Sequence, residues 1–157
     1  MTSPVLRIPH TLVRYTDESR IDTLLQAYDR EGLDALVTRL GVNVRVSGGK
    51  TILMLAAERD HLLATTSLLC RHADVAAVDD SGKTALHYAA MSGADGVAEV
   101  LIDAGAPVDM RDAEGRTPLW YAAARNYPDS AIVDVFLRAG ANPRLRDHHG
   151  VNANDML

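Results

Sequence analysis

The nine residues GKTALHYAA, at positions 82–90, decide the fold because close copies of them recur at a fixed distance. The copy before them is GKTILMLAA at 49–57, and the copy after them is GRTPLWYAA at 115–123. The copies are spaced by 33 residues, and a second apolar stretch follows each of them. A fixed period of this length predicts an array of stacked units, because a single unit cannot bury its apolar surface alone.

Each copy carries the features of a helix start. Thr51, Thr84 and Thr117 precede the apolar runs, at a position where a hydroxyl accepts hydrogen bonds from the free N–H groups of a first helical turn. Pro118 then stands at the first helical position, where its missing N–H costs nothing. A pair of alanines closes each copy, at 56–57, 89–90 and 122–123. These small residues let a neighbouring helix approach closely, so we expect helix-on-helix packing throughout the array.

The stretches SGGKT at 47–51 and SGKT at 81–84 look like the end of a phosphate-binding loop, but their spacing is wrong. Such a loop reads G-x-x-x-x-G-K-[ST], and its first glycine curls the backbone around the phosphates. That position holds Val44 in one case and Ala77 in the other. Neither stretch follows a buried apolar strand. The sequence therefore disfavours a nucleotide-binding enzyme.

The repeated unit resembles the ankyrin repeat, whose motif reads G-x-T-P-L-H-x-A-A, then a second helix, then G-A-D-V-N-A-x-D. The segments HADVAAVDD, GAPVDMRDAE and GANPRLRDHH match the last part of that motif. The resemblance implies an all-α solenoid of stacked helix-turn-helix units with short β-turn or hairpin fingers. It also implies that His87 bridges backbone groups of adjacent turns. Met54 and Trp120 stand at the equivalent positions of the other units, so this tether is expected to be absent there.

The repeat predicts the organisation of the chain as one domain. Two short amphipathic helices, the second placed after Gly32, resemble a divergent first repeat, and a fourth repeat stops soon after Gly150. The predicted parts are an N-terminal arm at 1–15, a capping repeat at 16–48, repeats at 49–81, 82–114 and 115–149, and a truncated repeat at 150–157. The third repeat holds a two-residue insertion within RNYPDS at 125–130, where Pro128 can start a helix and Tyr127 can project. The truncation is expected to leave apolar surface open around Val133 or Phe136, so the C-terminal edge could self-associate.

The ends of the second helices also follow a pattern. Gly105 and Gly140 stand where a left-handed residue is required, and His72 stands at that position in the first unit. A residue with a side chain is strained there, so His72 is expected to cost stability. The single cysteine, Cys70, lies in an apolar helical run, which predicts a buried and inert thiol.

Composition narrows the function classes. The chain has 157 residues, of which 47% are hydrophobic and only 4% aromatic, which is enough for a core of packed helices. The net charge of −5 gives no general attraction to nucleic acid or to an anionic membrane. The first 20 residues lack the pattern of a secretory signal, and no apolar run approaches 18 residues. We expect a cytoplasmic protein that is a monomer.

The residues do not form a catalytic or metal-binding set. His148 and His149 lie next to Asp147 without a third spaced ligand, which is a weak metal signal. The serines lack a nucleophile elbow, and no H-E-x-x-H or C-x-x-C motif occurs. We therefore predict no enzyme, no catalytic residue, no cofactor and no metal.

The resemblance implies a partner-binding surface on the concave side, formed by finger tips and exposed positions of the first helices. The positions carried over from the family hold seven cations and three anions, so the rest of the chain has a charge of −9. Either this is ordinary variation of a solvated surface, or arginines form a basic strip for an acidic protein surface. The predicted partner-binding residues are Lys83, Met91, Arg111, Glu114, Arg116, Trp120, Arg125, Tyr127, Arg146 and His148.

The predicted function is a non-enzymatic protein–protein interaction module that acts as an adaptor or regulator. A dedicated inhibitor, such as an immunity protein that neutralises a toxin or effector enzyme, is an alternative that the sequence leaves open. A nucleic-acid binder that uses the basic strip is a further alternative from another class, and it would lose affinity steeply with salt.

Overall fold

The computed structural model describes residues 16–27, 29–125 and 130–157. Eight α-helices form in these ranges, with no β-strand in the same part of the chain. The helices are α1 (Thr16–Gln26), α2 (Arg30–Leu40), α3 (Ile52–Glu58), α4 (Leu62–Cys70), α5 (Ala85–Ser92), α6 (Asp95–Asp103), α7 (Pro118–Arg125) and α8 (Ala131–Arg138). Two short 3₁₀ turns are η1 (Ser47–Gly49) and η2 (Ala153–Asp155). The predicted all-α solenoid is confirmed.

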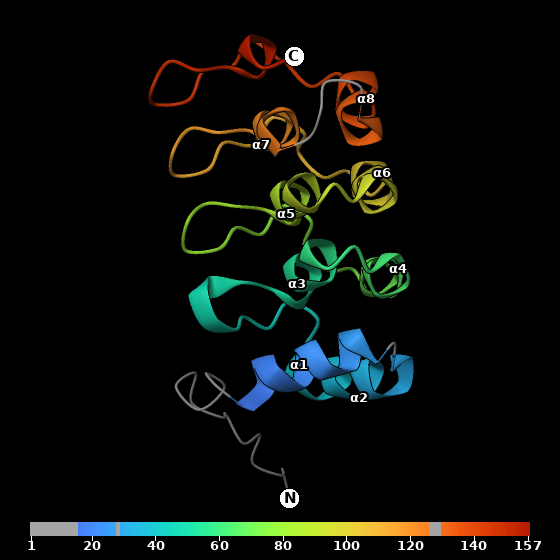
Figure 1. Cartoon of the computed structure of the whole chain (residues 1–157). Helices are drawn as coiled ribbons and strands as arrows, with labels where there is room; N and C mark the ends of the chain where they lie inside the picture. Colours follow the sequence, from blue (N-terminus) through green and yellow to red (C-terminus); the bar gives the residue numbers. More distant parts are fainter. Residues whose placement is uncertain (1–15, 28, 126–129) are drawn as a thin grey trace, which may run out of the picture.

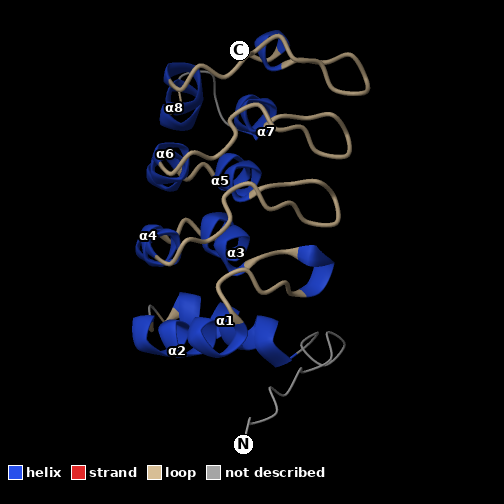
Figure 2. Cartoon of the chain, turned by 180° about the vertical axis from the view of Figure 1, so that it is seen from behind, coloured by secondary structure: helices blue, strands red, loops and turns tan. Residues whose placement is uncertain are grey.

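The helices stack in two layers. Figures 1 and 2 show α3, α5 and α7 in one column and α4, α6 and α8 in a second column beside it. The loops that precede α3, α5, α7 and η2 project to the side away from the second column. We call these loops the fingers. Because the units share this plan, equivalent residues of successive units lie in register along the column.

The first column is the centre of the core. Every residue of α5 from Ala85 to Ala90 is buried, and α3 is buried from Ile52 to Ala57. The alanine pairs have almost no exposed surface, with Ala56, Ala89 and Ala122 all at 0%. Helices α3 and α7 both pack against α5. Helices of seven or eight residues are not stable alone in water, so this mutual burial holds them.

Threonine caps begin the first helices as predicted. The Oγ1 atom of Thr51 accepts a hydrogen bond from the Met54 N–H at 3.3 Å, and Thr84 accepts one from the His87 N–H at 3.4 Å. Thr117 accepts from the Trp120 N–H at 3.2 Å, and Pro118 is the first residue of α7. These bonds satisfy backbone donors that the first helical turn leaves free.

The second helix of the N-terminal cap begins earlier than the sequence prediction placed it. Helix α2 starts at Arg30, and Gly32 lies inside its first turn. The carboxylate of Asp29 accepts a hydrogen bond from the Gly32 N–H at 2.9 Å. The prediction placed this helix after Gly32, whereas the capping aspartate three residues before Gly32 sets the boundary.

The prediction of an open apolar edge at Val133 and Phe136 is wrong. Val133 is 1% exposed and Phe136 is 0% exposed, because α8 turns this face towards α6 and α7. Leu137 is the large apolar residue of α8 that stays exposed, at 40%. The fourth unit ends in η2, which packs on α7 and which Asn152 caps.

Cys70 is exposed, which corrects the prediction of a buried thiol. It is the last residue of α4, on the outer column, and its apolar neighbours in sequence do not surround it in space. The predicted N-terminal arm and the predicted roles of Tyr127 and Pro128 fall on residues 1–15 and 126–129, which lie outside the described residues.

Two residues with side chains adopt left-handed backbone in the first unit. His72 has φ 59°, as predicted, and Asp60 has φ 52°. The residues 33 positions later are Gly105 and Gly93, with φ 87° and 74°. The prediction missed Asp60, although Gly93 marks the position in the next unit. A side chain in this conformation costs about 1 kcal/mol per residue.

We predict that His72→Gly stabilises the protein. Glycine removes the steric strain at φ 59°, so the free energy of unfolding should rise by about 1 kcal/mol and Tm by about 2–4 °C. Urea unfolding followed by circular dichroism measures the change. His72→Ala keeps a Cβ and should give no gain. If glycine and alanine behave alike, conformational strain at this position does not limit stability.

Candidate functional site

The fingers are joined to one another in series by backbone hydrogen bonds. The Asp80 N–H donates to the Gly48 carbonyl at 3.0 Å, and the Ala113 N–H donates to the Ser81 carbonyl at 2.9 Å. The His148 N–H donates to the Glu114 carbonyl at 3.0 Å. These bonds hold the exposed fingers as one continuous, ordered surface.

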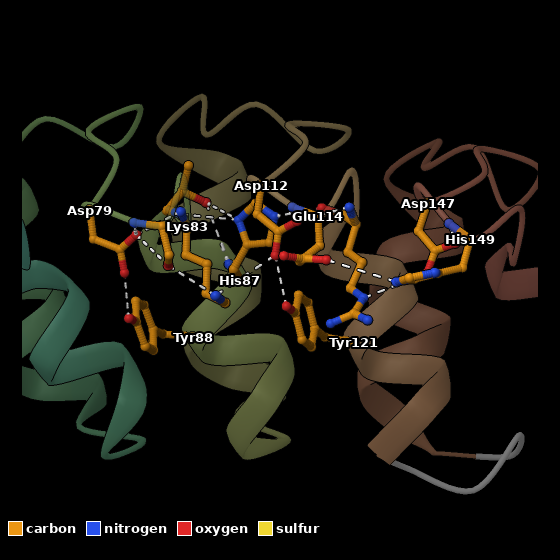
Figure 3. A network of polar contacts seen from close by, with 12 residues as sticks. Asp79, Lys83, His87, Tyr88, Asp112, Glu114, Tyr121, Asp147 and His149 are labelled. Carbon is orange, nitrogen blue, oxygen red and sulfur yellow. Dashed lines mark hydrogen bonds and ion pairs between the residues drawn. The ribbon is translucent and has the colours of Figure 1, made fainter. Parts of the chain in front are cut away.

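A buried aspartate organises each finger of the last three units. Asp79, Asp112 and Asp147 are each below 9% exposed. One oxygen of each carboxylate accepts hydrogen bonds from two backbone N–H groups of its own finger, at 2.8–2.9 Å. The second oxygen of Asp79 accepts from the Tyr88 hydroxyl at 2.6 Å, and that of Asp112 accepts from the Tyr121 hydroxyl at 2.7 Å (Figure 3). The fingers of Asp79 and Asp112 are thereby fixed to the first helices α5 and α7.

The hydrogen bonds hold the Asp79 carboxylate in the charged form. Burial alone would raise the pKa of Asp79, but the Tyr88 hydroxyl and the N–H groups of Lys83 and Ser81 lower it below its usual value. Burial and the neighbouring carboxylate of Asp79 raise the pKa of Tyr88. The network is thus a set of proton donors around a carboxylate that stays ionised.

His87 forms the tether that the family resemblance implies. Its Nδ1 atom accepts from the Thr84 N–H at 3.0 Å, and its Nε2 atom lies 3.2 Å from the Arg116 carbonyl oxygen in the next finger. Burial lowers the pKa of the imidazole, and the bond to Arg116 opposes that shift. A neutral ring with these two partners is structural.

The equivalent positions of the other units differ. In the first unit, Met54 makes one of the two bonds of the tether: its sulfur accepts a hydrogen bond from the Thr51 N–H at 3.4 Å, as His87 Nδ1 does from Thr84. The Trp120 Nε1 atom is buried, and it has no hydrogen-bond partner among the residues that the structure describes. The third unit therefore lacks the tether, as predicted, and leaves an indole donor unsatisfied.

A row of cations lies over aromatic rings beside the fingers. Lys50 Nζ is 4.6 Å from the centre of the Tyr88 ring, and the Arg116 guanidinium is 4.4 Å from the centre of the Trp120 ring. Each cation of the row also has a carboxylate nearby. The distances are 2.9 Å from Lys50 to Glu58, 3.8 Å from Lys83 to Asp112 and 3.6 Å from Arg116 to Asp147. The charges of Lys83 and Arg116 are thus largely balanced inside the array.

Three finger arginines have no such balance. Arg111 donates to the carbonyls of Gly115 at 3.0 Å and of Arg146 at 2.6 Å, and Arg146 donates to the Gly150 carbonyl. Arg45 donates in the same way to Gly49 at 2.8 Å. Within the described residues, no carboxylate lies within 4.0 Å of these guanidinium groups. Carbonyl acceptors carry no charge, so these arginines stay net positive.

The sequence prediction missed Arg45 and the aspartate–tyrosine pairs. Arg45 lies 66 residues before Arg111, which is two repeat periods, and Val78 replaces the arginine between them. The spacing of 33 between Asp79 and Asp112 and between Tyr88 and Tyr121 was an available signal. It could not show that the two side chains meet, because that contact depends on how the finger folds over the helix.

The remaining predicted residues lie on the fingers or on the first helices. Arg125, Glu114 and His148 are exposed, and Met91 and Trp120 are partly exposed. Glu114 lies 4.0 Å from His149. Tyr127 lies outside the described residues. Apart from Tyr127, the predicted residues thus belong to the fingers and the first column, and their role in binding stays a prediction.

The described residues hold no cluster of three or more His, Cys, Asp or Glu side chains that could bind a metal ion. None of their helices has the length and apolar character to cross a lipid bilayer.

Comparison with known proteins agrees with this architecture. A family model described as "Ankyrin repeats (3 copies)" matches residues 21–112 and 53–147. The chain therefore belongs to the ankyrin-repeat family. Ankyrin repeats generally mediate protein–protein interaction and are typically not catalytic.

Several relatives share the repeats. The chain is 32% identical to NF-kappa-B inhibitor delta of Mus musculus over 149 residues, which is 88% of this chain and 43% of that protein. It is 38% identical to Neurogenic locus notch homolog protein 1 of Homo sapiens over 97 residues, which is 60% of this chain and 4% of that protein. An ADP-ribosylation factor GTPase-activating protein, AGD2 of Arabidopsis thaliana, is 39% identical over 71 residues, 45% of this chain and 9% of that protein. The chain spans less than half the length of these relatives.

We predict that Tyr88→Phe weakens the protein in a pH-dependent way. The pKa of Asp79 is lowered in the folded state, so its carboxylate stabilises the fold above its ordinary pKa of about 3.9. That contribution is lost as pH falls through the folded-state pKa. Removing the hydroxyl should cost about 1–2 kcal/mol at pH 7 and less at pH 3.

Urea unfolding of the wild type and the variant at both pH values measures the effect. In the background of Asp79→Asn, the same tyrosine change should cost much less, because the charged acceptor is gone. An equal cost in both backgrounds, or at both pH values, would show that the hydroxyl–carboxylate bond does not carry the effect.

Proposed function

We propose that this array is a non-enzymatic module that binds a protein partner on its concave side, through the fingers and the first column of helices, as an adaptor or regulator. The observation that carries the proposal is the row of finger arginines with no balancing carboxylate. The fingers are also linked by backbone hydrogen bonds. A fixed surface loses little conformational freedom on binding, which favours affinity.

The charge of this surface favours an acidic partner. Arg111, Arg125 and Arg146 are exposed, although the chain as a whole has a net charge of −5. Guanidinium groups bind carboxylates with two parallel hydrogen bonds, which suits recognition of Asp and Glu side chains. Lys83 and Arg116 contribute less, because Asp112 and Asp147 already lie near them. The proposed basic strip therefore consists of Arg111 and Arg146 on the fingers and Arg125 at the end of α7.

Trp120 is the proposed aromatic anchor of the same surface. It is partly exposed, and its ring contacts the Arg116 guanidinium and, edge to face, the Tyr121 ring, whose centre is 5.3 Å away. Tryptophan at the centre of an interface often dominates the binding energy. A histidine at this position would make the tether that His87 makes, so tryptophan here gives up a structural bond.

A second candidate is a dedicated inhibitor of one protein. It is favoured by the similarity to NF-kappa-B inhibitor delta over 88% of the chain. The two roles differ in outcome: an inhibitor abolishes the activity of its purified partner at equimolar concentration, whereas an adaptor leaves that activity intact. An immunity protein is the special case in which the partner is a toxin.

The first test of the surface is a charge reversal at Arg125. A partner is first captured from the native host and identified by mass spectrometry. Because the Arg125 guanidinium is exposed at the end of α7, Arg125→Glu should leave folding intact and lower affinity by about tenfold or more, mainly through a slower association rate at low salt. Surface plasmon resonance at two salt concentrations measures both rates.

Arg138→Glu is the matched control, because Arg138 is 71% exposed on α8 in the outer column. The control should bind like the wild type. If both reversals weaken binding equally, only net charge matters, and the proposed surface is wrong.

The second test is Trp120→His, which separates binding from stability. The imidazole can accept from the Thr117 N–H and reach the next finger as His87 does, so stability should change by no more than about 1 kcal/mol. Affinity for the captured partner should fall by about 30-fold or more. Trp120→Ala should lose both stability and affinity. Unchanged binding by Trp120→His would remove the anchor from the proposal.

A further inference from the structure

The stacking of the outer column is interrupted at its N-terminal end. Helices α4, α6 and α8 pack against one another in sequence. Figure 1 shows α1 and α2 running across the view, whereas α3 to α8 are seen nearly end-on. Between this cap and α4 there is a cavity of about 310 Å³. The cap is thus rotated away from the packing direction of the repeats, which leaves a groove on the outer side.

The groove is apolar inside and charged at its rim. Its apolar lining comes from Leu24, Leu25, Leu33, Leu63 and Ala64. Leu63 is 73% exposed, more than any other large apolar side chain among the described residues. At one end Asp34 bridges the cap to α4, with its carboxylate 3.1 Å from Arg71 and 3.4 Å from the Ser67 hydroxyl. An open apolar groove of this kind is rare on a soluble surface unless something covers it.

The chemistry of the chain itself indicates an occupant. Residues 1–15 hold Val5, Leu6 and Ile8, with two arginines and no acidic residue. Residues 16–40, which form the cap, hold six acidic residues and three arginines, a balance of −3. A basic apolar segment is therefore joined directly to an acidic cap that carries an apolar groove.

The covalent geometry allows the segment to reach the groove. Helix α1 begins at Thr16, and Leu24 lies eight residues along it, about 12 Å away. The eight residues from Ile8 to Thr16 span up to about 27 Å when extended. Pro4 and Pro9 disfavour a helix in this segment, and in an extended chain Leu6 and Ile8 fall on the same side.

We propose that the apolar residues 5–8 of this chain dock into the groove between the cap and α4. Leu6 and Ile8 contact Leu24, Leu33 and Leu63, and the arginines of the segment lie near the acidic residues of the cap. The docked segment completes the outer column on the side where α2 does not. This contact is separate from the proposed partner surface, which lies on the fingers.

The single cysteine provides a direct probe. Cys70 is exposed, lines the same groove and is the only cysteine of the chain. A docked segment protects it, so its reaction with a thiol reagent such as 5,5′-dithiobis(2-nitrobenzoic acid) should be slow in the full chain. The triple variant Val5→Ser, Leu6→Ser, Ile8→Ser should react about fivefold faster or more. Thr2→Ala, Ser3→Ala, Thr11→Ala changes the same segment without removing an apolar side chain, and it should react like the wild type.

Two adjacent leucines of α4 test whether the groove lining is needed for docking. Leu63 lines the groove, whereas Leu62 is 42% exposed and does not. Leu63→Ser should speed the reaction of Cys70, and Leu62→Ser should not. Combining Leu63→Ser with the triple variant should add little, because both remove one contact. The comparison of the two leucine variants remains informative even if the triple variant misfolds. Leu63 is 73% exposed, so replacing it should not disturb the fold.

Equal rates in the wild type and the triple variant would overturn the proposal. Faster reaction in both leucine variants would overturn it as well. Protection that grows with protein concentration would mean that a second copy fills the groove, and this too contradicts docking within the chain. The proposal is supported if Cys70 is protected in dilute protein and if the triple variant and Leu63→Ser each remove this protection.

Discussion

The structure depends on the close approach of short first helices that have no core of their own. Ala56, Ala89 and Ala122 have no exposed surface, because the helix of the next unit occupies the space that a larger side chain would need. Each first helix is held by its two neighbours, so removing one unit exposes apolar surface on both sides. Stability is therefore a property of the stack, shared between nearest neighbours.

This dependence explains why the fingers need their own polar framework. A finger has too little apolar surface to fold by burial, so Asp79, Asp112 and Asp147 replace a core with hydrogen bonds to backbone N–H groups. Tyr88 and Tyr121 connect two of these carboxylates to the first column. The surface that partners would meet is thus positioned by the stacked helices, and rigid positioning is what a binding surface requires.

The sequence predicted what repeats and missed what depends on the direction of a helix face. Threonine caps and alanine pairs follow from spacing, and the His87 tether is implied by the family resemblance; the structure confirms all three. The errors at Cys70, Val133 and Phe136 have another origin, because apolar residues on an outer helix are buried only where a neighbouring helix meets them. The start of α2 at Arg30 was missed because the Asp29 cap outweighs the tendency of Gly32 to break a helix. The groove beside α4 could not be predicted, since it arises from the orientation of the cap.

Departures from the repeated pattern differ in kind between the first and third units. In the first unit, Val46 and Leu55 stand where the next unit has Asp79 and Tyr88, and both are buried. That exchange replaces a buried hydrogen bond between Asp79 and Tyr88 with buried apolar side chains. In the third unit, Trp120 leaves its indole N–H without a partner, and Arg125 puts an exposed charge where the second unit has Ser92. In the described part of the chain, the first change leaves a buried donor unsatisfied and the second adds an unpaired surface charge, and departures of this kind concentrate at functional sites. The third unit, rather than the array as a whole, is therefore where selection for binding is expected to outweigh selection for stability.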